Sequence, residues 1–222
     1  MRTLLRAKFG TFLGDRHGAA AIELAFIAPV MIVLALAGVD TTRYVEATES
    51  ISKVASTIAQ MITANTTGSV NYVDLQFYHD SAMVIFPDVL RDAAQQGVPW
   101  YNDISISMSS IQFTAKPANC TKNCKYTPKI IWTGGNNPRA CGAKLKSVAD
   151  TSIPSATTLP TDIYGPGSVI VVDVQYNYHP YFISFLGASI SISRSIYMAP
   201  RYVPLISYQV VSGDNGIAVS CP

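Results

Sequence analysis

The stretch HGAAAIELAFIAPVMIVLALAGV, from His17 to Val39, decides how this chain is organised. Leu24–Val39 is uncharged over 16 positions. With Ala19–Ile22 before it, the segment reaches about the 20 apolar residues that cross a bilayer as a helix. One carboxylate, Glu23, stands near its start, although ionisable groups in hydrocarbon are costly and usually functional. The sequence therefore predicts one membrane-spanning helix in which the Glu23 carboxylate has a functional role.

The residues before this stretch are basic. Residues 1–18 hold four basic residues against one acid, whereas the rest of the chain has 12 basic and 13 acidic residues. A basic arm before an apolar span predicts that the arm stays in the cytoplasm and that the C-terminal bulk is exported. The exported part is nearly neutral, so no basic patch suited to nucleic acid is expected.

Three interpretations compete for the first forty residues. A secretory signal peptide has a shorter apolar region, of about 7–15 residues, followed by a cleavage site. A plain signal anchor fits the length and the basic flank but leaves Glu23 unexplained. A prepilin-type segment accounts for all of these features, because it consists of a basic leader, Gly18, four residues, Glu23 and an uninterrupted apolar helix.

This pattern is similar to type IV prepilin segments and most closely resembles the TadE/TadG-like pseudopilins of tight-adherence (Flp-type) systems. The residues that match the N-terminal pattern of that family are Gly18–Ala25, Pro29 and Asp40–Arg43. Leu24 stands where Flp pilins usually have Tyr, which favours a minor pseudopilin over the major subunit. The function implied by the resemblance is assembly of a tight-adherence pilus or secretion filament.

The resemblance also implies a processing step. A prepilin peptidase would cut after Gly18, so that the mature chain starts at Ala19 with Glu23 as its fifth residue. The new α-amine would then lie four residues before the carboxylate, on the same face of the helix. In a filament, Glu23 would neutralise the Ala19 amine of a neighbouring subunit, because an unpaired buried charge is expensive.

The partners implied by the resemblance are those of pilus assembly. They comprise the prepilin peptidase, the major pilin, other pseudopilins, and an inner-membrane assembly platform with its ATPase. The expected location is the bacterial inner membrane, crossed once, with the N-terminus cytoplasmic and the C-terminal domain periplasmic or extracellular.

Helical periodicity continues beyond the apolar stretch. A stripe of apolar and small residues extends the first helix to Asn65, so we predict a helix over 19–65 that is transmembrane in 19–39. Val73–Gln96 is a second helical region, either one helix or two separated at Pro87. Its candidate core positions are Leu75, Tyr78, Ala82, Ile85, Leu90 and Ala94.

Runs of β-branched and alternating residues follow. They predict strands of an antiparallel sheet at Ile104–Phe113, Lys129–Thr133, Ser168–Tyr178 and Ala188–Met198, with Leu205–Val211 as one more. The predicted fold class is α+β, with a long N-terminal helix packed on a C-terminal domain that contains this sheet. The domains are a leader at 1–18, the helix at 19–65 and an exported head at 66–222.

The four cysteines lie on the predicted exported side, at Cys120, Cys124, Cys141 and Cys221. Their even number predicts two disulfides in an oxidising compartment, and three pairings are open. These bonds would tether 134–167, a long stretch rich in Gly, Pro, Ser, Thr and Asn with few apolar residues of its own. A zinc site is disfavoured, because the CxxxC has no second pair and no nearby His, and we expect no metal.

No catalytic motif stands out. The sequence contains no HExxH, GxSxG, P-loop or dinucleotide-binding fingerprint, so we expect neither an enzyme nor a cofactor. The acids Asp103, Asp162 and Asp173 are interpreted as solvated faces and caps. The competing class of function is a membrane-anchored exported binding domain, such as an adhesin, in which residues 1–40 form a plain signal anchor.

Overall fold

The computed structural model describes residues 16–182 and 189–222, so the predicted leader lies outside the described residues up to position 15. The structure consists of two compact units. The first holds the N-terminal helix up to Val45 and the segment that starts at Pro180. The second holds Glu46–His179 and Ser189–Pro222. Each unit is described separately below.

Helix α2 (Arg16–Thr63) runs through Pro29 as one element of 48 residues. It ends close to the predicted stop, where the Asn65 Oδ1 accepts hydrogen bonds from the backbone N–H of Thr67 and of Gly68, both at 2.9 Å. In the second unit, the predicted stripe of this helix is buried. Its almost fully buried side chains are Ala47, Ile51, Val54, Ala55, Ile58, Ala59 and Ile62.

The second helical region forms two helices separated at Pro87, which was one of the two predicted alternatives. Helix α3 (Tyr72–Ile85) begins with a capping box between Asn71 and Asp74. Helix α4 (Asp88–Gln96) ends at Gly97, whose φ of 68° is left-handed, and the short helix α5 (Trp100–Asp103) follows. Leu75 and Ala82 are buried as predicted.

The predicted buried face of α4 is wrong. Leu90 is 44% exposed and Ala94 is exposed, whereas Val89, Asp92 and Ala93 are buried. Because the helix restarts after Pro87, its periodicity is no longer in phase with that of α3. The buried stripe therefore falls one residue from the predicted positions and includes a carboxylate.

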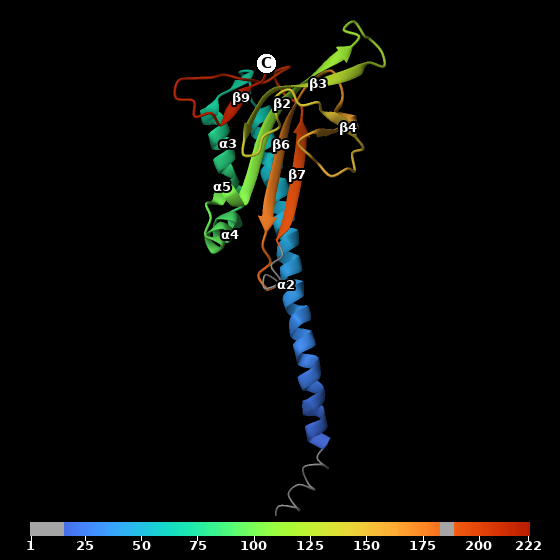
Figure 1. Cartoon of the computed structure of the whole chain (residues 1–222), viewed down its shortest axis with the longest axis vertical. Coiled ribbons are helices and arrows are strands. Elements are labelled where there is room, and N and C mark those ends of the chain that lie inside the picture. The colour runs from blue at the N-terminus through green and yellow to red at the C-terminus, as the bar shows by residue number, and fades with distance from the viewer. Residues whose placement is uncertain (1–15, 183–188) are drawn as a thin grey trace, which may run out of the picture. The chain divides into compact units, whose positions relative to one another are not determined.

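A five-stranded sheet forms the centre of the second unit, which confirms the predicted α+β class (Figure 1). Its strand order is β7-β6-β2-β3-β9, and each neighbouring pair is antiparallel. The strands are β2 (Ile104–Lys116), β3 (Lys125–Gly135), β6 (Gly167–Tyr178), β7 (Ile190–Met198) and β9 (Ala218–Ser220). Ala188, where the fourth predicted strand begins, lies outside the described residues.

Two short parallel pairs lie beside this sheet. β1 (Ser69–Val70) pairs with β8 (Ser207–Tyr208), which is all that forms of the strand predicted at 205–211. β4 (Lys146–Val148) pairs with β5 (Thr158–Pro160), and the 3-10 helix η1 (Thr161–Ile163) follows. The predicted loop at 134–167 therefore contains regular structure of its own.

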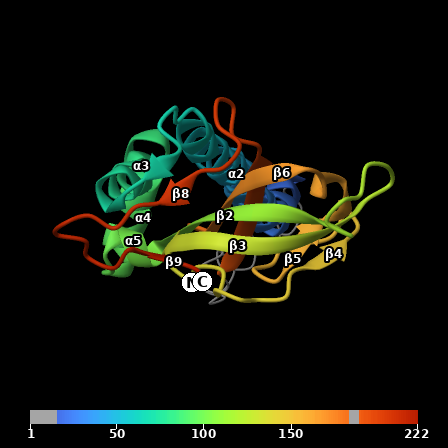
Figure 2. The same cartoon turned by 90° about the horizontal axis from the view of Figure 1, so that it is seen from above.

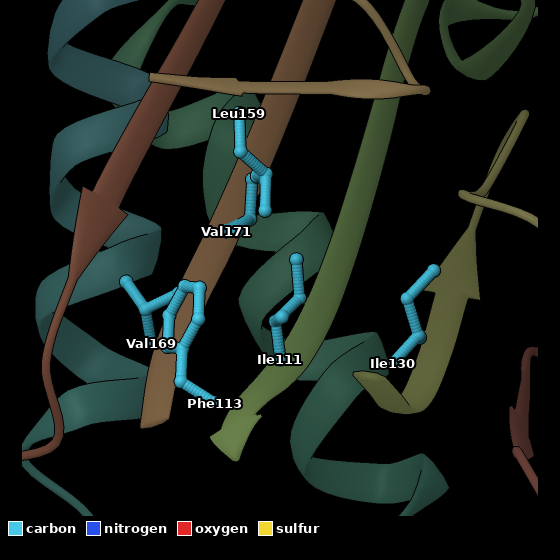
Figure 3. Packing of buried hydrophobic residues seen from close by; sticks show 6 residues of the cluster. All are labelled: Ile111, Phe113, Ile130, Leu159, Val169 and Val171. Carbon is cyan, nitrogen blue, oxygen red and sulfur yellow. The ribbon is translucent and has the colours of Figure 1, made fainter. Parts of the chain in front are cut away.

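Both faces of the sheet are covered. On β2, the fully buried side chains of Ile104, Ile106 and Met108 are spaced two residues apart and therefore share one face of the sheet. The helices lie on one side of the strands in Figure 2. Ile111 and Phe113 point to the opposite face and pack with Leu159 of β5, as Figure 3 shows. Leu159 is fully buried, so the stretch predicted to lack packing residues supplies one to the core.

Candidate functional site

The first half of α2 presents an apolar surface from Ala21 to Val39 that is interrupted only by Glu23. Ala21–Thr63 is the one described helix that is long and apolar enough to cross a membrane, and its most apolar stretch has a mean hydropathy of 2.4 with no residue buried. The large side chains exposed between 40% and 80% are Ile22, Leu24, Phe26, Ile27, Val30, Met31, Ile32, Val33, Leu34 and Val39. Leaving them in water costs on the order of 10 kcal/mol, so this surface requires lipid or other helices around it.

Glu23 belongs to this surface. It is exposed, and its neighbours one turn ahead on the same helix are Phe26 and Ile27, which are 76% and 56% exposed. Gly18 and Ala19 lie in the first turns of α2, so the backbone from the predicted cleavage point to Glu23 is helical. Ala19 lies four residues before Glu23, about one helical turn away on the same face of α2.

The apolar surface of α2 ends at Asp40, a buried acid held by hydrogen bonds. The Asp40 carboxylate, 4% exposed, accepts hydrogen bonds from the backbone N–H of Tyr181 at 3.0 Å and of Phe182 at 3.1 Å. The Arg43 guanidinium lies 4.2 Å from the centre of the Tyr181 ring. These contacts attach the segment that starts at Pro180 to α2 inside the first unit. The sequence singled out Asp40–Arg43 but not this partner.

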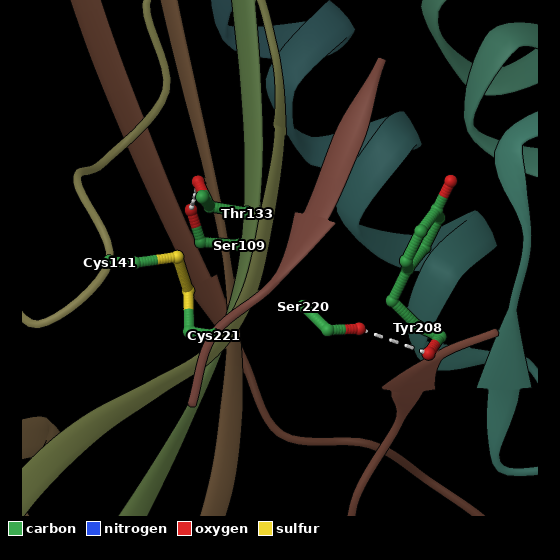
Figure 4. The surroundings of a disulfide bond; sticks show 6 residues. All are labelled: Ser109, Thr133, Cys141, Tyr208, Ser220 and Cys221. Carbon is green, nitrogen blue, oxygen red and sulfur yellow. Dashed lines mark hydrogen bonds between the residues drawn. A yellow bond between two sulfur atoms is a disulfide. The ribbon is translucent and has the colours of Figure 1, made fainter. Parts of the chain in front are cut away.

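The four cysteines form the two predicted disulfides, and the structure specifies their pairing. Cys120–Cys124 joins residues four apart between β2 and β3. Cys141–Cys221 joins residues 80 apart and connects the stretch after β3 to the chain just after β9, beside the Ser109–Thr133 hydrogen bond in Figure 4. Only the second bond tethers the stretch at 134–167, whereas the first closes a short loop before it, so the expectation that both bonds tether this stretch is wrong.

Asp173 is not a solvated acid, contrary to prediction. It forms two hydrogen bonds with Arg139, from Nε to Oδ2 at 2.7 Å and from Nη2 to Oδ1 at 2.9 Å, and it accepts another from Ser195. Arg139 is fully buried and also donates to the carbonyls of Ala156 and Thr158. Burial alone would lower the pKa of Arg139, but its hydrogen bond to Asp173 and the charge of that carboxylate raise the pKa instead.

Asp103 is also buried, at 5% exposed, and sits with Asp92 and His179 in the second unit. Asp92 Oδ2 accepts a hydrogen bond from the Tyr176 hydroxyl at 2.6 Å and lies 3.1 Å from His179 Nδ1. Burial, followed by the charge of Asp92, raises the pKa of Asp103 to about 7, while His179 acts in the opposite direction. The prediction of a solvated Asp103 is therefore wrong.

The third of these acids is exposed, as predicted. Asp162 has a raised pKa because of a hydrogen bond with Asp150 and the charge of that neighbour. Sequence reasoning missed the group around Asp103, because its members come from α4, α5 and the end of β6. No local signal in the sequence pointed to it, because the predicted buried face of α4, at Leu90 and Ala94, did not include Asp92.

Comparison with known proteins agrees with the N-terminal pattern. Residues 18–60 match the family model described as TadE-like protein. No curated protein matches the chain, and no solved structure does either. The matched segment starts at Gly18 and includes Glu23, the exposed apolar surface and Asp40. Residues 18–60 are therefore TadE-like, consistent with a TadE-like pseudopilin of the tight-adherence system, a family associated with a minor-pilin role.

Proposed function

We propose that this protein is a minor pilin that takes part in assembling a tight-adherence pilus or a related secretion filament. The observation that carries the proposal is the TadE-like match, which begins at Gly18 and covers the part of α2 with the exposed apolar surface. That surface suits a helix stored in a bilayer and later packed among the helices of other subunits. We propose no enzymatic activity for this chain.

The proposed maturation is cleavage of the Gly18–Ala19 peptide bond by a prepilin peptidase. It leaves a charged α-amine one helical turn before Glu23, at the end of an apolar surface. A lone carboxylate costs roughly 2.5–3.5 kcal/mol at the bilayer centre and less near the end of the span, where Glu23 lies, and pairing with an amine offsets this cost. The amine of an adjoining subunit pairs with Glu23 only in the correct register, which gives the charge its role in assembly.

The proposed orientation follows from charge and from the cysteines. The basic leader stays in the cytoplasm, and the second unit lies on the periplasmic side, where its two disulfides are stable. The proposed partners are the prepilin peptidase, the major pilin, other pseudopilins and the inner-membrane assembly platform with its ATPase.

The test is an intact-mass measurement of the protein purified from its native membrane. The expected mass is that of a chain starting at Ala19. Gly18→Phe should abolish the mass change, because the residue before the cut must be small, whereas Gly14→Phe is the matched control in the same leader and should still be processed. A full-length mass in cells with an active peptidase contradicts the proposal and favours the anchored binding domain instead.

A further inference from the structure

Three side chains of metal-ligand type converge in the second unit. Asp92 comes from α4, Asp103 from the end of α5 and His179 from just beyond β6, and their ligand atoms all lie within 4.8 Å of one another. The two aspartates are 8% and 5% exposed, and the His179 side chain is 28% exposed. We propose that these three residues bind a divalent transition-metal cation of the zinc class.

An independent observation points to a missing ligand at this place. Asp103 Oδ2 is buried and has no hydrogen-bond partner among the described residues. Buried polar atoms are nearly always satisfied, and a carboxylate oxygen without a donor loses its hydration with nothing in exchange. A cation between Asp103 and its two neighbours supplies the missing interaction.

The geometry around Asp92 fits coordination. Its Oδ2 and His179 Nδ1 form a hydrogen-bonded pair at 3.1 Å, and a cation that displaced the shared proton would hold the two atoms at a similar separation, about 3.3 Å for tetrahedral bonds of about 2.0 Å. The Tyr176 hydroxyl donates to the same oxygen and fixes the carboxylate. Hydrogen bonds of this kind orient the ligands in metal sites.

The ligand chemistry selects the class of metal. Imidazole nitrogen is a good ligand for zinc and its transition-metal neighbours, whereas calcium and magnesium prefer oxygen alone. Two carboxylates and one imidazole make three protein ligands, and the partly exposed side of His179 leaves room for a water as the fourth. All four cysteines of the chain are in disulfides, so no thiolate competes for the ion.

The role of such a site is structural. The cation joins α4, α5 and the end of β6, and it balances two carboxylates that otherwise repel each other inside the domain. Its ligand His179 is the residue directly before Pro180, where the chain passes from the second unit to the first.

The experiment uses the full chain in detergent, purified without a polyhistidine tag and stripped of metal with a chelator. Equilibrium dialysis against Zn²⁺, with Ca²⁺ as a separate arm, is read by elemental mass spectrometry. We expect the wild type to bind one Zn²⁺ per chain. The affinity for Zn²⁺ should fall by about tenfold or more in Asp103→Asn and in His179→Gln. Asp80→Asn is the matched control, because Asp80 forms the other His–Asp contact, with His79 at 3.2 Å.

Thermal unfolding keeps the test independent of folding defects. Asn is nearly isosteric with Asp, so Asp103→Asn should fold, as its circular dichroism will report. Zn²⁺ should raise the Tm of the wild type and of Asp80→Asn but not of Asp103→Asn. The proposal is overturned if the wild type binds no Zn²⁺ at tens of micromolar, if Asp103→Asn binds like the wild type, or if Ca²⁺ binds more tightly than Zn²⁺. A wild type that binds no metal and is less stable than Asp103→Asn would instead identify a pair of carboxylates that share a proton.

Discussion

Removing the Cys141–Cys221 disulfide should destabilise the second unit far more than removing Cys120–Cys124. The two bonds close loops of very different length, since their sequence separations are 80 and 4. In the chain-entropy treatment of cross-links, these loops correspond to about 4.5 and about 2 kcal/mol of free energy of unfolding at 25 °C. The expected difference between the two is about 2.5 kcal/mol, because it depends on the logarithm of the ratio of loop lengths.

The assay is urea unfolding of the full chain in detergent, comparing the double variants Cys120→Ser/Cys124→Ser and Cys141→Ser/Cys221→Ser. Trp132 is a suitable fluorescent reporter, because it is fully buried and its Nε1 donates to the Ile206 carbonyl at 2.9 Å. With a urea dependence of about 2 kcal/mol/M, the midpoint should fall by about 1 M in the first variant and by about 2 M in the second.

One outcome refutes this reasoning directly. If the variant that lacks the short-range disulfide loses as much stability as the other, loop closure does not determine the effect. Local contacts around each bond would then matter more than the restriction of the unfolded chain. Reduction of the wild type breaks both bonds, so its midpoint should fall by about 3 M, the sum of the two losses, which controls for effects of the serine side chains.

Three further predictions concern charged residues. Glu23→Gln should still be processed but should not assemble, so cells with this variant should lack pili on their surface. Glu46→Gln, on the same helix, is the control and should assemble normally. Piliated Glu23→Gln cells would contradict the pairing of Glu23 with the Ala19 amine. Asp40→Ala removes the carboxylate that accepts hydrogen bonds from the backbone N–H groups of Tyr181 and Phe182, so both amides should exchange hydrogen with solvent faster. The exchange rate should rise by about tenfold for each ~1.5 kcal/mol by which local opening becomes easier. An unchanged exchange rate would mean that other contacts hold the segment. Arg139→Met leaves a carboxylate without its buried partner and should cost about 3–5 kcal/mol in urea unfolding. The exposed Arg194→Met should cost less than about 0.5 kcal/mol, and equal losses would argue against a special role for the buried pair.

The elements with a clear periodicity were predictable from the sequence. The stripe from Ile51 to Ile62 has helical spacing and is buried as expected, and three of the predicted strand runs contain most of β2 and β6 and all of β7. These segments bury one face or both against many neighbours, so their amino-acid pattern directly reflects their environment.

The parts that depend on distant partners were not predictable. Asp92 occupies the buried side of α4 because Tyr176 and His179 bind its carboxylate, and both lie more than eighty residues away in sequence. Buried acids look like solvated acids in a sequence when their partners are not adjacent. For the same reason, Asp173 was assigned to a solvated face although Arg139 forms two hydrogen bonds with it.

The candidate site at the N-terminus shows the opposite behaviour. Gly18, Glu23 and the apolar residues after them are recognisable because their spacing along one helix is itself the signal, and the TadE-like match covers them. Disulfide pairing, by contrast, had three solutions, since spacing along the chain says little about which cysteines meet after folding.

If the second unit is exported as proposed, the bond between Cys141 and Cys221 would impose an order on its folding. β9 completes the edge of the sheet beside β3, and the bond just after it could not close until every residue between the two cysteines had crossed the membrane. The edge of the sheet at β9 would then be cross-linked only after the C-terminal residues had crossed. Oxidation of this last thiol pair would then act as a completion mark that separates finished subunits from those still in transit.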